Sequence, residues 1–257
     1  MHFDCYWLRE DKWCDFVWDE AQYPNRSAMI AGLKENGYKI SLWINPYVTI
    51  TTEMYQEGKE KGYFAKNKEG EPYEADLWHG LLSPCVLLDF TNKDASAWFK
   101  AKLKTVLKEG VDVLKTDFGE DIPYDALFSN GMTGKELRNV YSRLYNQAVF
   151  EAVSYTHLTV VFWRGASSEM DKTEFYWESP FPDSSVLCVH MPHGYGNSGN
   201  LSSDMDITVP RVKELLESLG AKSTTDVVLL MNGSDHIIGQ KDICEVVRQL
   251  NLSLIHI

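Results

Sequence analysis

The segment from Val113 to Pro123, VLKTDFGEDIP, constrains the fold of this chain more than any other. It continues an apolar, β-branched stretch that begins at Val111, and it ends in charged residues and a glycine. This pattern is typical of a parallel strand that is buried on both faces and whose carboxyl end opens into a functional site. We therefore expect a buried strand here, with polar side chains at its end.

Lys115 and Asp117 are two residues apart, so their side chains point to the same side of such a strand. The ammonium group of Lys115 would keep the carboxyl group of Asp117 ionised, because an opposite charge favours the charged form. An ionised, well-positioned carboxylate can act as a nucleophile. The alternative is a structural ion pair at the end of a strand, and these two residues alone do not decide between the two.

The first half of the chain alternates between expected strands and expected helices. The strands are expected at 3–7, 38–44 and 111–116, and the helices at 27–36, 52–61, 92–109 and 134–153. Such alternation predicts a parallel sheet with right-handed crossovers. Acidic and aromatic residues follow the expected strands, as they do at the functional face of a (β/α)₈ barrel.

The second half also has an α/β pattern. Its strands are expected at 160–163, 175–177, 186–191 and 227–231, and its helices at 209–219 and 241–250. The fold class predicted for the whole chain is therefore α/β.

The composition of the chain indicates which binding partners and which cellular compartment to expect. A chain of 257 residues with 44% hydrophobic residues can bury a substantial core. Its net charge of −12 argues against a nucleic-acid partner, which requires a basic face. No apolar stretch approaches the length of a membrane span, so we expect no membrane partner. Five cysteines without CxxC spacing predict reduced thiols and a cytoplasmic location.

The first half contains five motifs in this order: MHFDCYW, WCDFVWD, KISLWINPY, LLDFTN and KTDFGEDIP. In their order and intervals they resemble the α-glycosidases of glycoside hydrolase family 31. The resemblance covers about residues 1–152 and points to the α-xylosidase branch. It implies a retaining α-glycosidase that acts on an oligosaccharide or α-glycoside. It also implies that the chain holds about strands two to four of a (β/α)₈ TIM barrel, and that the first strand and an N-terminal sandwich domain are missing from it.

The resemblance also implies roles for individual residues. Asp117 would be the catalytic nucleophile. Substrate-binding residues would be Asp4, Cys5, Tyr6, Trp43, Lys115 and Phe118. The Cys5–Tyr6 pair would shape the pocket around a xylosyl unit, and the alternative for Trp43 is a plain core aromatic. No residue matches the acid/base of the family, so we expect weak or no activity. A non-catalytic carbohydrate-binding remnant is the alternative.

Residues 160–250 resemble instead the later catalytic domain of glycoside hydrolase family 38, the zinc-dependent α-mannosidases. The likeness rests on EFYWESP, SVLCVHMPHGYGN and VVLLMNGSDH. By this resemblance Asp235 would be an acid/base, and a turn cap is the alternative. The zinc ligands of that family are not identifiable, because His190, His193 and His236 lack the spacing of a metal-ligand set. We therefore expect no bound metal and no cofactor; zinc would be implied only if this family 38-like half were complete.

The two resemblances meet at 154–159. SYTHL at 154–158 and LSLIHI at 252–257 both resemble translated sequencing-adapter text. We therefore predict a chimeric fragment with a partial family 31 barrel at 1–153, a junction at 154–159 and a second α/β fragment at 160–257. A natural fusion of the two segments is the alternative.

Overall fold

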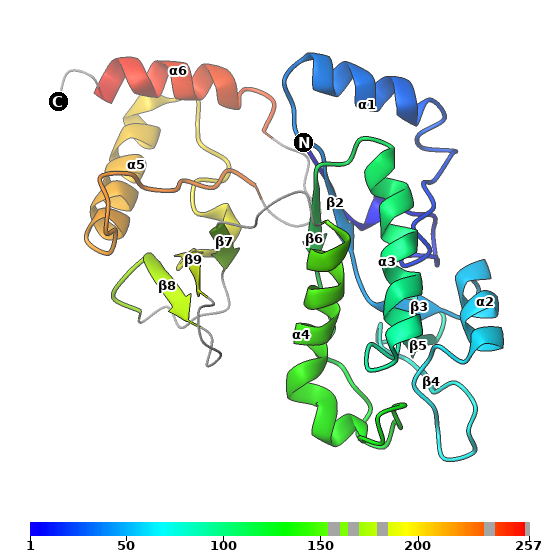
Figure 1. Ribbon diagram of the computed structural model, residues 1–257. Coiled ribbons are helices and arrows are strands. Elements are labelled where there is room, and N and C mark those ends of the chain that lie inside the picture. Colours follow the sequence, from blue (N-terminus) through cyan, green and yellow to red (C-terminus); the bar gives the residue numbers. More distant parts are fainter. Residues whose placement is uncertain (154–159, 164–169, 179–184, 234–239, 255–257) are drawn as a thin grey trace. The chain divides into compact units, whose positions relative to one another are not determined.

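The computed structural model describes residues 1–153, 160–163, 170–178, 185–233 and 240–254, and Figure 1 labels its elements along the chain. The class is mixed α/β, as the sequence predicts. The chain divides into two compact units, Met1–Thr156 and His157–Ile257, which are described separately below. In the described ranges, no helix is both long and apolar enough to cross a membrane.

A parallel sheet of three strands organises the first unit. In sheet order its strands are β1 (His2–Phe3), β2 (Ser41–Ile44) and β6 (Val113–Thr116). Phe3 is opposite Leu42, and Trp43 is opposite Lys115. The parallel pairing expected from the alternation is thus confirmed. The closure of these strands into part of a barrel stays a prediction.

Four helices of the first unit begin and end within one residue of their predicted ranges: α1 (Arg26–Glu35), α2 (Glu53–Lys61), α3 (Lys93–Lys108) and α4 (Gly134–Ala152). Side-chain caps set three of the starts, because the first backbone N–H groups of a helix lack partners within it. Thr52 accepts from the N–H of Tyr55, and Asn92 accepts from two N–H groups of α3. At α4, the backbone N–H and the hydroxyl of Thr133 both donate to Glu136 at 2.8 Å.

A second, antiparallel sheet of the first unit was not predicted. Its strands are β3 (Tyr47–Thr49), β5 (Cys85–Leu87) and β4 (Glu74–Ala75), in that sheet order. Strands of two or three residues are too short to show the alternation from which a strand is predicted. Its first strand, β3, follows β2 directly in the chain, and the hydroxyl of Tyr47 in β3 bonds the backbone that follows β6.

Two expectations for the parallel strands were wrong in part. The expected strand at 3–7 ends at Phe3, and a 3₁₀ helix, η1 (Cys5–Trp7), follows because the Asp4 carboxylate accepts from the backbone N–H of Cys5 at 2.9 Å. The strand expected at 111–116 is not buried on both faces. Val113 is 50% exposed, since β6 is at the edge of its sheet.

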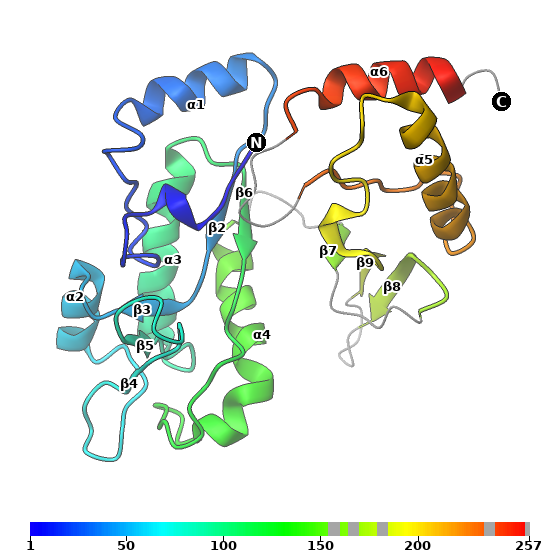
Figure 2. The same cartoon turned by 180° about the vertical axis from the view of Figure 1, so that it is seen from behind.

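Large aromatic side chains hold the first unit together. The ring of Phe99 on α3 packs against Phe16, Phe90 and Tyr145 at centroid distances of 5.2 to 6.1 Å. Tyr145 is fully buried, and its hydroxyl donates to the carbonyl of Ile44 at 3.1 Å. A buried hydroxyl requires such a partner. The bond ties α4 to the end of β2, while α3 and α4 lie side by side (Figures 1 and 2).

The second unit has its own sheet and two helices. In sheet order the strands are β7 (Val160–Trp163), β9 (Ser185–His190) and β8 (Glu174–Glu178), with β9 parallel to β7 and antiparallel to β8. The helices α5 (Met205–Gly220) and α6 (Ile243–Leu254) pack on each other around Val212, Val246 and Leu250.

The strand expected at 227–231 is absent, although this segment is described. Its β-branched, apolar residues favour a strand, but its backbone groups bond to a loop instead. Asn197 donates to the carbonyl of Leu229 at 3.2 Å and accepts from the N–H of Met231 at 2.6 Å, and the N–H of Ser198 donates to the carbonyl of Met231 at 2.9 Å. These bonds replace the ladder of a strand.

Candidate active site

Three neighbouring strands bring the candidate residues to one edge of the parallel sheet. Asp4 follows β1, Trp43 is in β2, and Lys115 and Asp117 lie at the end of β6. Because parallel strands all point their carboxyl ends to the same edge, residues far apart in the sequence meet there. The structure brings these four side chains together, because Asp117 contacts Trp43 and Lys115, and Lys115 contacts Asp4.

The carboxylate of Asp117 is held on both oxygens. Its Oδ2 accepts from the indole N–H of Trp43 at 2.9 Å and lies 3.6 Å from the ammonium of Lys115. Its Oδ1 accepts from the backbone N–H of Phe118 at 3.2 Å. The backbone N–H of Asp117 donates to the carbonyl of Ile44 at 2.9 Å, which continues the sheet pairing beyond β6. With 43% of its side chain exposed, this carboxylate remains accessible to a substrate.

Asp4, Lys115 and Asp117 form a row of alternating charges across the strand ends. The Oδ2 of Asp4 lies 3.1 Å from Nε2 of His2 and 3.4 Å from the ammonium of Lys115. The hydrogen bond with His2, the backbone N–H of Cys5 and the charge of Lys115 hold the pKa of Asp4 well below its usual range, against the opposing effect of burial. Lys115 therefore lies between two carboxylates, Asp4 and Asp117.

Trp43 is a buried hydrogen-bond donor as well as a strand residue. Its side chain is only 3% exposed, and its ring meets those of Trp13 and Phe118 edge to face, at centroid distances of 5.9 and 6.1 Å. Its carbonyl accepts from the indole of Trp7 at 2.8 Å. Both readings of the sequence apply in part, since Trp43 is a core aromatic whose N–H also contacts Asp117. A direct contact with sugar stays a prediction.

The Cys5–Tyr6 pair divides between the core and the surface. Cys5 is 2% exposed, and burial together with the charge of Asp4 raises the pKa of its thiol to about 12, so the thiol stays protonated at neutral pH. Tyr6 is 55% exposed, and its ring meets Trp13 edge to face at 5.8 Å. Of the two, only Tyr6 presents a large surface to a ligand.

The turn after Asp117 is fixed by a single tyrosine and one helix. The hydroxyl of Tyr47 accepts from the backbone N–H groups of Gly119 and Asp121 at 2.9 and 3.0 Å, and the hydroxyl of Ser142 on α4 donates to the carbonyl of Gly119 at 2.9 Å. Gly119 has a φ of 102°, which favours glycine. The turn therefore leaves the sheet at a defined angle, and the Asp117 carboxylate starts from a fixed backbone.

One residue close to the Asp117 turn, Trp78, was not predicted from the sequence. The ring of Trp78 meets that of Phe118 at a centroid distance of 4.5 Å, although it comes from a loop between β4 and β5 that carries no expected element. The only signal in the sequence is a tryptophan shortly before the LLDFTN motif.

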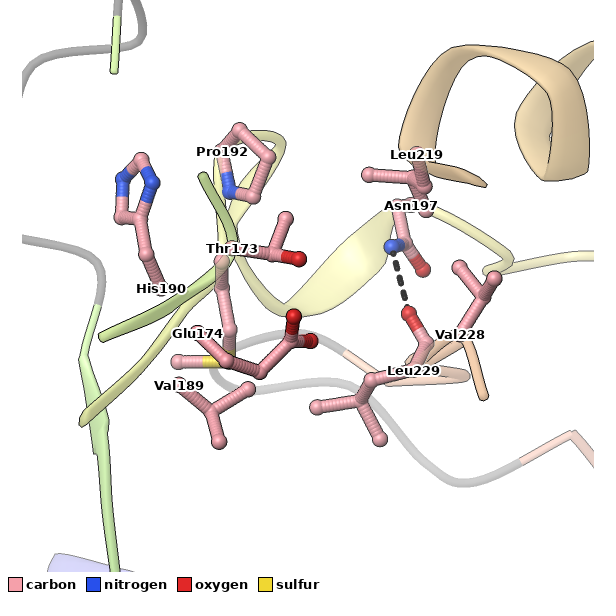
Figure 3. A pocket seen from close by; sticks show the side chains of 10 residues that line it. Thr173, Glu174, Val189, His190, Pro192, Asn197, Leu219, Val228 and Leu229 are labelled. Carbon is pink, nitrogen blue, oxygen red and sulfur yellow. Dashed lines mark hydrogen bonds between the residues drawn. The ribbon is translucent and has the colours of Figure 1, made fainter. Parts of the chain in front are cut away.

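Of the residues singled out in the second unit, His190 and His193 belong to the described part of the chain. Asp235 and His236 lie outside the described residues. His190 is 3% exposed beside a cavity of about 20 Å³, which is room for about one water molecule (Figure 3). Across the described ranges, no group of three or more His, Cys, Asp or Glu side chains is placed to hold a metal ion.

The chain is similar to known proteins of one family. The family model described as the glycosyl hydrolases family 31 TIM-barrel domain matches residues 1–179, which includes the predicted junction at 154–159. An α-xylosidase from Emericella nidulans is 36% identical over 181 residues, covering 69% of this chain and 23% of that protein. The α-xylosidase XylQ of Lactiplantibacillus pentosus is 37% identical over 154 residues, covering 60% of this chain and 20% of that protein.

A solved structure is similar as well. The family 31 sulfoquinovosidase from E. rectale, in complex with an aza-sugar inhibitor, is 33% identical with a TM-score of 0.52, and the match covers 55% of this chain and 21% of that one. The chain thus spans only 20% to 23% of the length of the two α-xylosidases.

Proposed function

Because this chain belongs to glycosyl hydrolase family 31, we propose that it is the nucleophile-bearing part of a retaining α-glycosidase, with Asp117 as the nucleophile. The observation that carries the proposal is the environment of the Asp117 carboxylate. Trp43 donates to it at 2.9 Å and the Lys115 ammonium lies 3.6 Å away. The donor and the cation hold one carboxylate oxygen in place, and a positioned carboxylate can act as a nucleophile.

The chemistry follows from this placement. The carboxylate attacks the anomeric carbon of the sugar, the bond to the leaving group breaks, and an ester between Asp117 and the sugar forms. Water then hydrolyses the ester, with retention of configuration after two displacements. Trp43, Lys115 and the N–H of Phe118 orient the carboxylate before attack, which lowers the barrier through positioning.

A second carboxyl group is needed to protonate the leaving group, about 5 Å from the nucleophile. Glu120 and Asp121 follow Asp117 in the turn, and neither matches the acid/base of the family. General acid catalysis is worth roughly 10²–10⁴-fold in rate. We propose that the chain reacts with substrates whose leaving group departs unprotonated and turns over ordinary α-glycosides weakly or not at all.

The substrate class proposed is an α-xyloside. Two of the similar proteins are named α-xylosidases, and the exposed ring of Tyr6 follows Asp4 at the strand ends. Asp4, Lys115 and Phe118 complete the proposed sugar-binding set. Asp4 and Lys115 are each about one-third exposed, so their polar atoms are available to sugar hydroxyl groups.

For residues 160–257 we retain two proposals. A family 38-like fragment, with Asp235 as its acid/base, rests on the sequence motifs alone. A continuous family 31 segment is supported by the match through residue 179. DNA sequence read across the codons for 154–158 and beyond residue 257 separates a chimera from a natural chain. A chelator tests the first proposal, since it abolishes zinc-dependent mannosidase activity and leaves carboxylate chemistry intact.

The proposed function is tested with an activated α-xylosyl fluoride and with a xylose-containing disaccharide that has an ordinary leaving group. We expect the full chain to release fluoride from the first in a burst and to leave the second nearly unchanged. Asp117→Ala should abolish the burst. Asp121→Ala, in the same turn, is the matched control and should keep it. A burst that survives in Asp117→Ala, or rapid disaccharide hydrolysis lost in that variant, would contradict the proposal as stated.

A further inference from the structure

Trp78 lies at the centre of an aromatic cluster that includes Trp43 and Phe118, the two residues whose N–H groups donate to the Asp117 carboxylate. Its side chain is 7% exposed. Its ring centroid is 4.5 Å from Phe118, 5.4 Å from Trp13, 5.8 Å from Tyr47 and 6.3 Å from Trp43. None of these contacts is predicted by the sequence, because Trp78 belongs to a loop that joins two very short strands.

Two of these neighbours are the residues that hydrogen-bond the carboxylate. Trp43 donates to Oδ2 of Asp117 and the backbone of Phe118 donates to Oδ1. A third neighbour, Tyr47, fixes the turn that follows. We propose that Trp78 is a positioning residue: it holds Trp43 and Phe118 against each other so that both oxygens of Asp117 keep their donors. This inference deepens the proposed function and rests on it, because positioning Asp117 matters for catalysis only if Asp117 is the nucleophile.

Phe118 needs such support because of its backbone. Its φ is 61°, a left-handed conformation that a bulky residue adopts only where its surroundings hold it there. Trp78 meets the Phe118 ring at an interplanar angle of 66°, and Trp43 meets it at 81°. Edge-to-face contacts of this kind are directional. The two tryptophans therefore fix the Phe118 ring from two sides, and with it the N–H that points at Asp117.

The loop that carries Trp78 is itself anchored. The N–H and hydroxyl of Ser83 donate to the two carboxylate oxygens of Asp11 at 2.6 and 2.7 Å. Within the loop, the N–H of Gly80 donates to Asp76 at 2.9 Å. The two Ser83 bonds join the loop to the segment that precedes Trp13. The backbone that follows Trp78 is thus fixed by hydrogen bonds.

The test compares Trp78→Leu and Trp78→Phe with the full wild-type chain and with Trp98→Phe. Trp98 is the matched control because it is a buried tryptophan of the same unit whose indole donates to Glu57, away from Asp117. Two readouts are followed: the indole N–H resonance of Trp43, assigned by its absence in Trp43→Phe, and the kinetics of covalent labelling by a fluorinated α-xylosyl fluoride.

We expect the Trp43 indole proton to move upfield in Trp78→Leu, since its bond to Asp117 lengthens, and by a smaller amount in Trp78→Phe. The maximal labelling rate should fall at least about tenfold in Trp78→Leu, because misplacement of a reacting group costs up to about 10²-fold. The reagent concentration for half-maximal rate should change little. In Trp98→Phe neither readout should move.

The proposal is overturned if the Trp43 resonance and the labelling rate are unchanged in both Trp78 variants, or if Trp98→Phe changes them equally. The Trp98 indole resonance reports whether each Trp78 variant is folded. If Trp78→Leu does not fold, the partial shift in Trp78→Phe decides. The Trp43 resonance needs no reactivity, so a wild-type chain that is never labelled counts against the proposed function and leaves this test valid.

Discussion

The two units of the chain differ in how they are packed. The first unit has one continuous core that joins both of its sheets to its helices and includes the rings of Trp7, Phe99 and Tyr145. In the described part of the second unit, the buried apolar cluster consists of Leu201, Val212, Val246 and Leu250. The charged strand-end residues belong to the unit with the larger core. A site that holds two hydrogen-bond donors on one carboxylate needs a large packed core around it, because the packing of neighbouring side chains fixes the site residues.

A matched pair of core truncations tests this difference and should give the largest effect. Leu103 on α3 is fully buried in the first unit, and Leu250 on α6 is 6% exposed in the second. Leu→Ala changes in cores cost about 2–5 kcal/mol, more where the site cannot collapse. We expect Leu103→Ala near the upper end and Leu250→Ala near the lower end. Hydrogen exchange read by mass spectrometry, peptide by peptide, assigns each loss to its unit.

Equal losses in both variants would break the comparison, because they would show that the second unit is packed as tightly as the first. A loss in Leu250→Ala that spreads over peptides of the first unit would break it in another way, since the two units would then unfold together.

The strand ends were predictable from the sequence for a physical reason. The period of a strand places Lys115 and Asp117 on one side, and the parallel register brings Trp43 opposite Lys115. Trp78 could not be predicted in this way. Its position depends on a turn with left-handed residues at His79 and Gly80, and no periodicity describes such a turn.

The two segments wrongly expected to be strands have a common cause. In the segment 227–231 and after Phe3, apolar and aromatic residues favour a strand, but polar side chains satisfy the backbone first. Asn197 accepts from the N–H of Met231, and Asp4 accepts from that of Cys5. Such side-chain acceptors compete with sheet pairing. Asp4 is adjacent to Cys5, whereas Asn197 is 34 residues from Met231, a contact that only the three-dimensional structure shows.

The second prediction concerns a substitution that removes one hydrogen-bond donor to the nucleophile. In Trp43→Phe an aromatic ring remains, but the indole N–H that donates to Asp117 at 2.9 Å is lost. Loss of one preorganised donor costs roughly 10²–10³-fold in rate. We expect a decrease of about 10²-fold in the labelling rate by a fluorinated α-xylosyl fluoride. Trp177→Phe, at a site 47% exposed in the second unit, should leave the rate unchanged. Equal effects of the two would remove the distinction between the units.

The smallest expected effect comes from two glutamates with similar pKa values. Hydrogen bonds with Lys102, Lys61 and Trp98 lower the pKa of Glu57 to about 2, and those with Arg248 and Gln249 lower the pKa of Glu245 to about 2. Glu57 is partly covered, with 35% of its side chain exposed, whereas Glu245 is part of an exposed helical pair. Solvent screens the exposed pair more strongly.

Because the folded-state pKa of Glu57 lies below its ordinary value of 4.5, its stabilisation is present above pH 4.5 and is lost as the pH falls towards 2. Glu57→Gln should lower stability by about 1 kcal/mol or less at neutral pH. It should also flatten the pH dependence of the first unit below pH 4.5. Glu245→Gln should have no measurable effect. Thermal unfolding from pH 7 to pH 2 checks both, and a steeper loss for Glu245→Gln would contradict the reasoning.

The most direct test of the account is the location of the covalent ester. The full chain is treated with a fluorinated α-xylosyl fluoride, digested at acidic pH and mapped by mass spectrometry. We predict one added fluorinated xylosyl unit, on Asp117, in the peptide that contains KTDFGEDIP, and none in Asp117→Ala. An ester on another carboxylate, such as Asp4, Glu120 or Asp235, would contradict the account, because the strand-end carboxylate held by Trp43 and Lys115 would then not be the nucleophile.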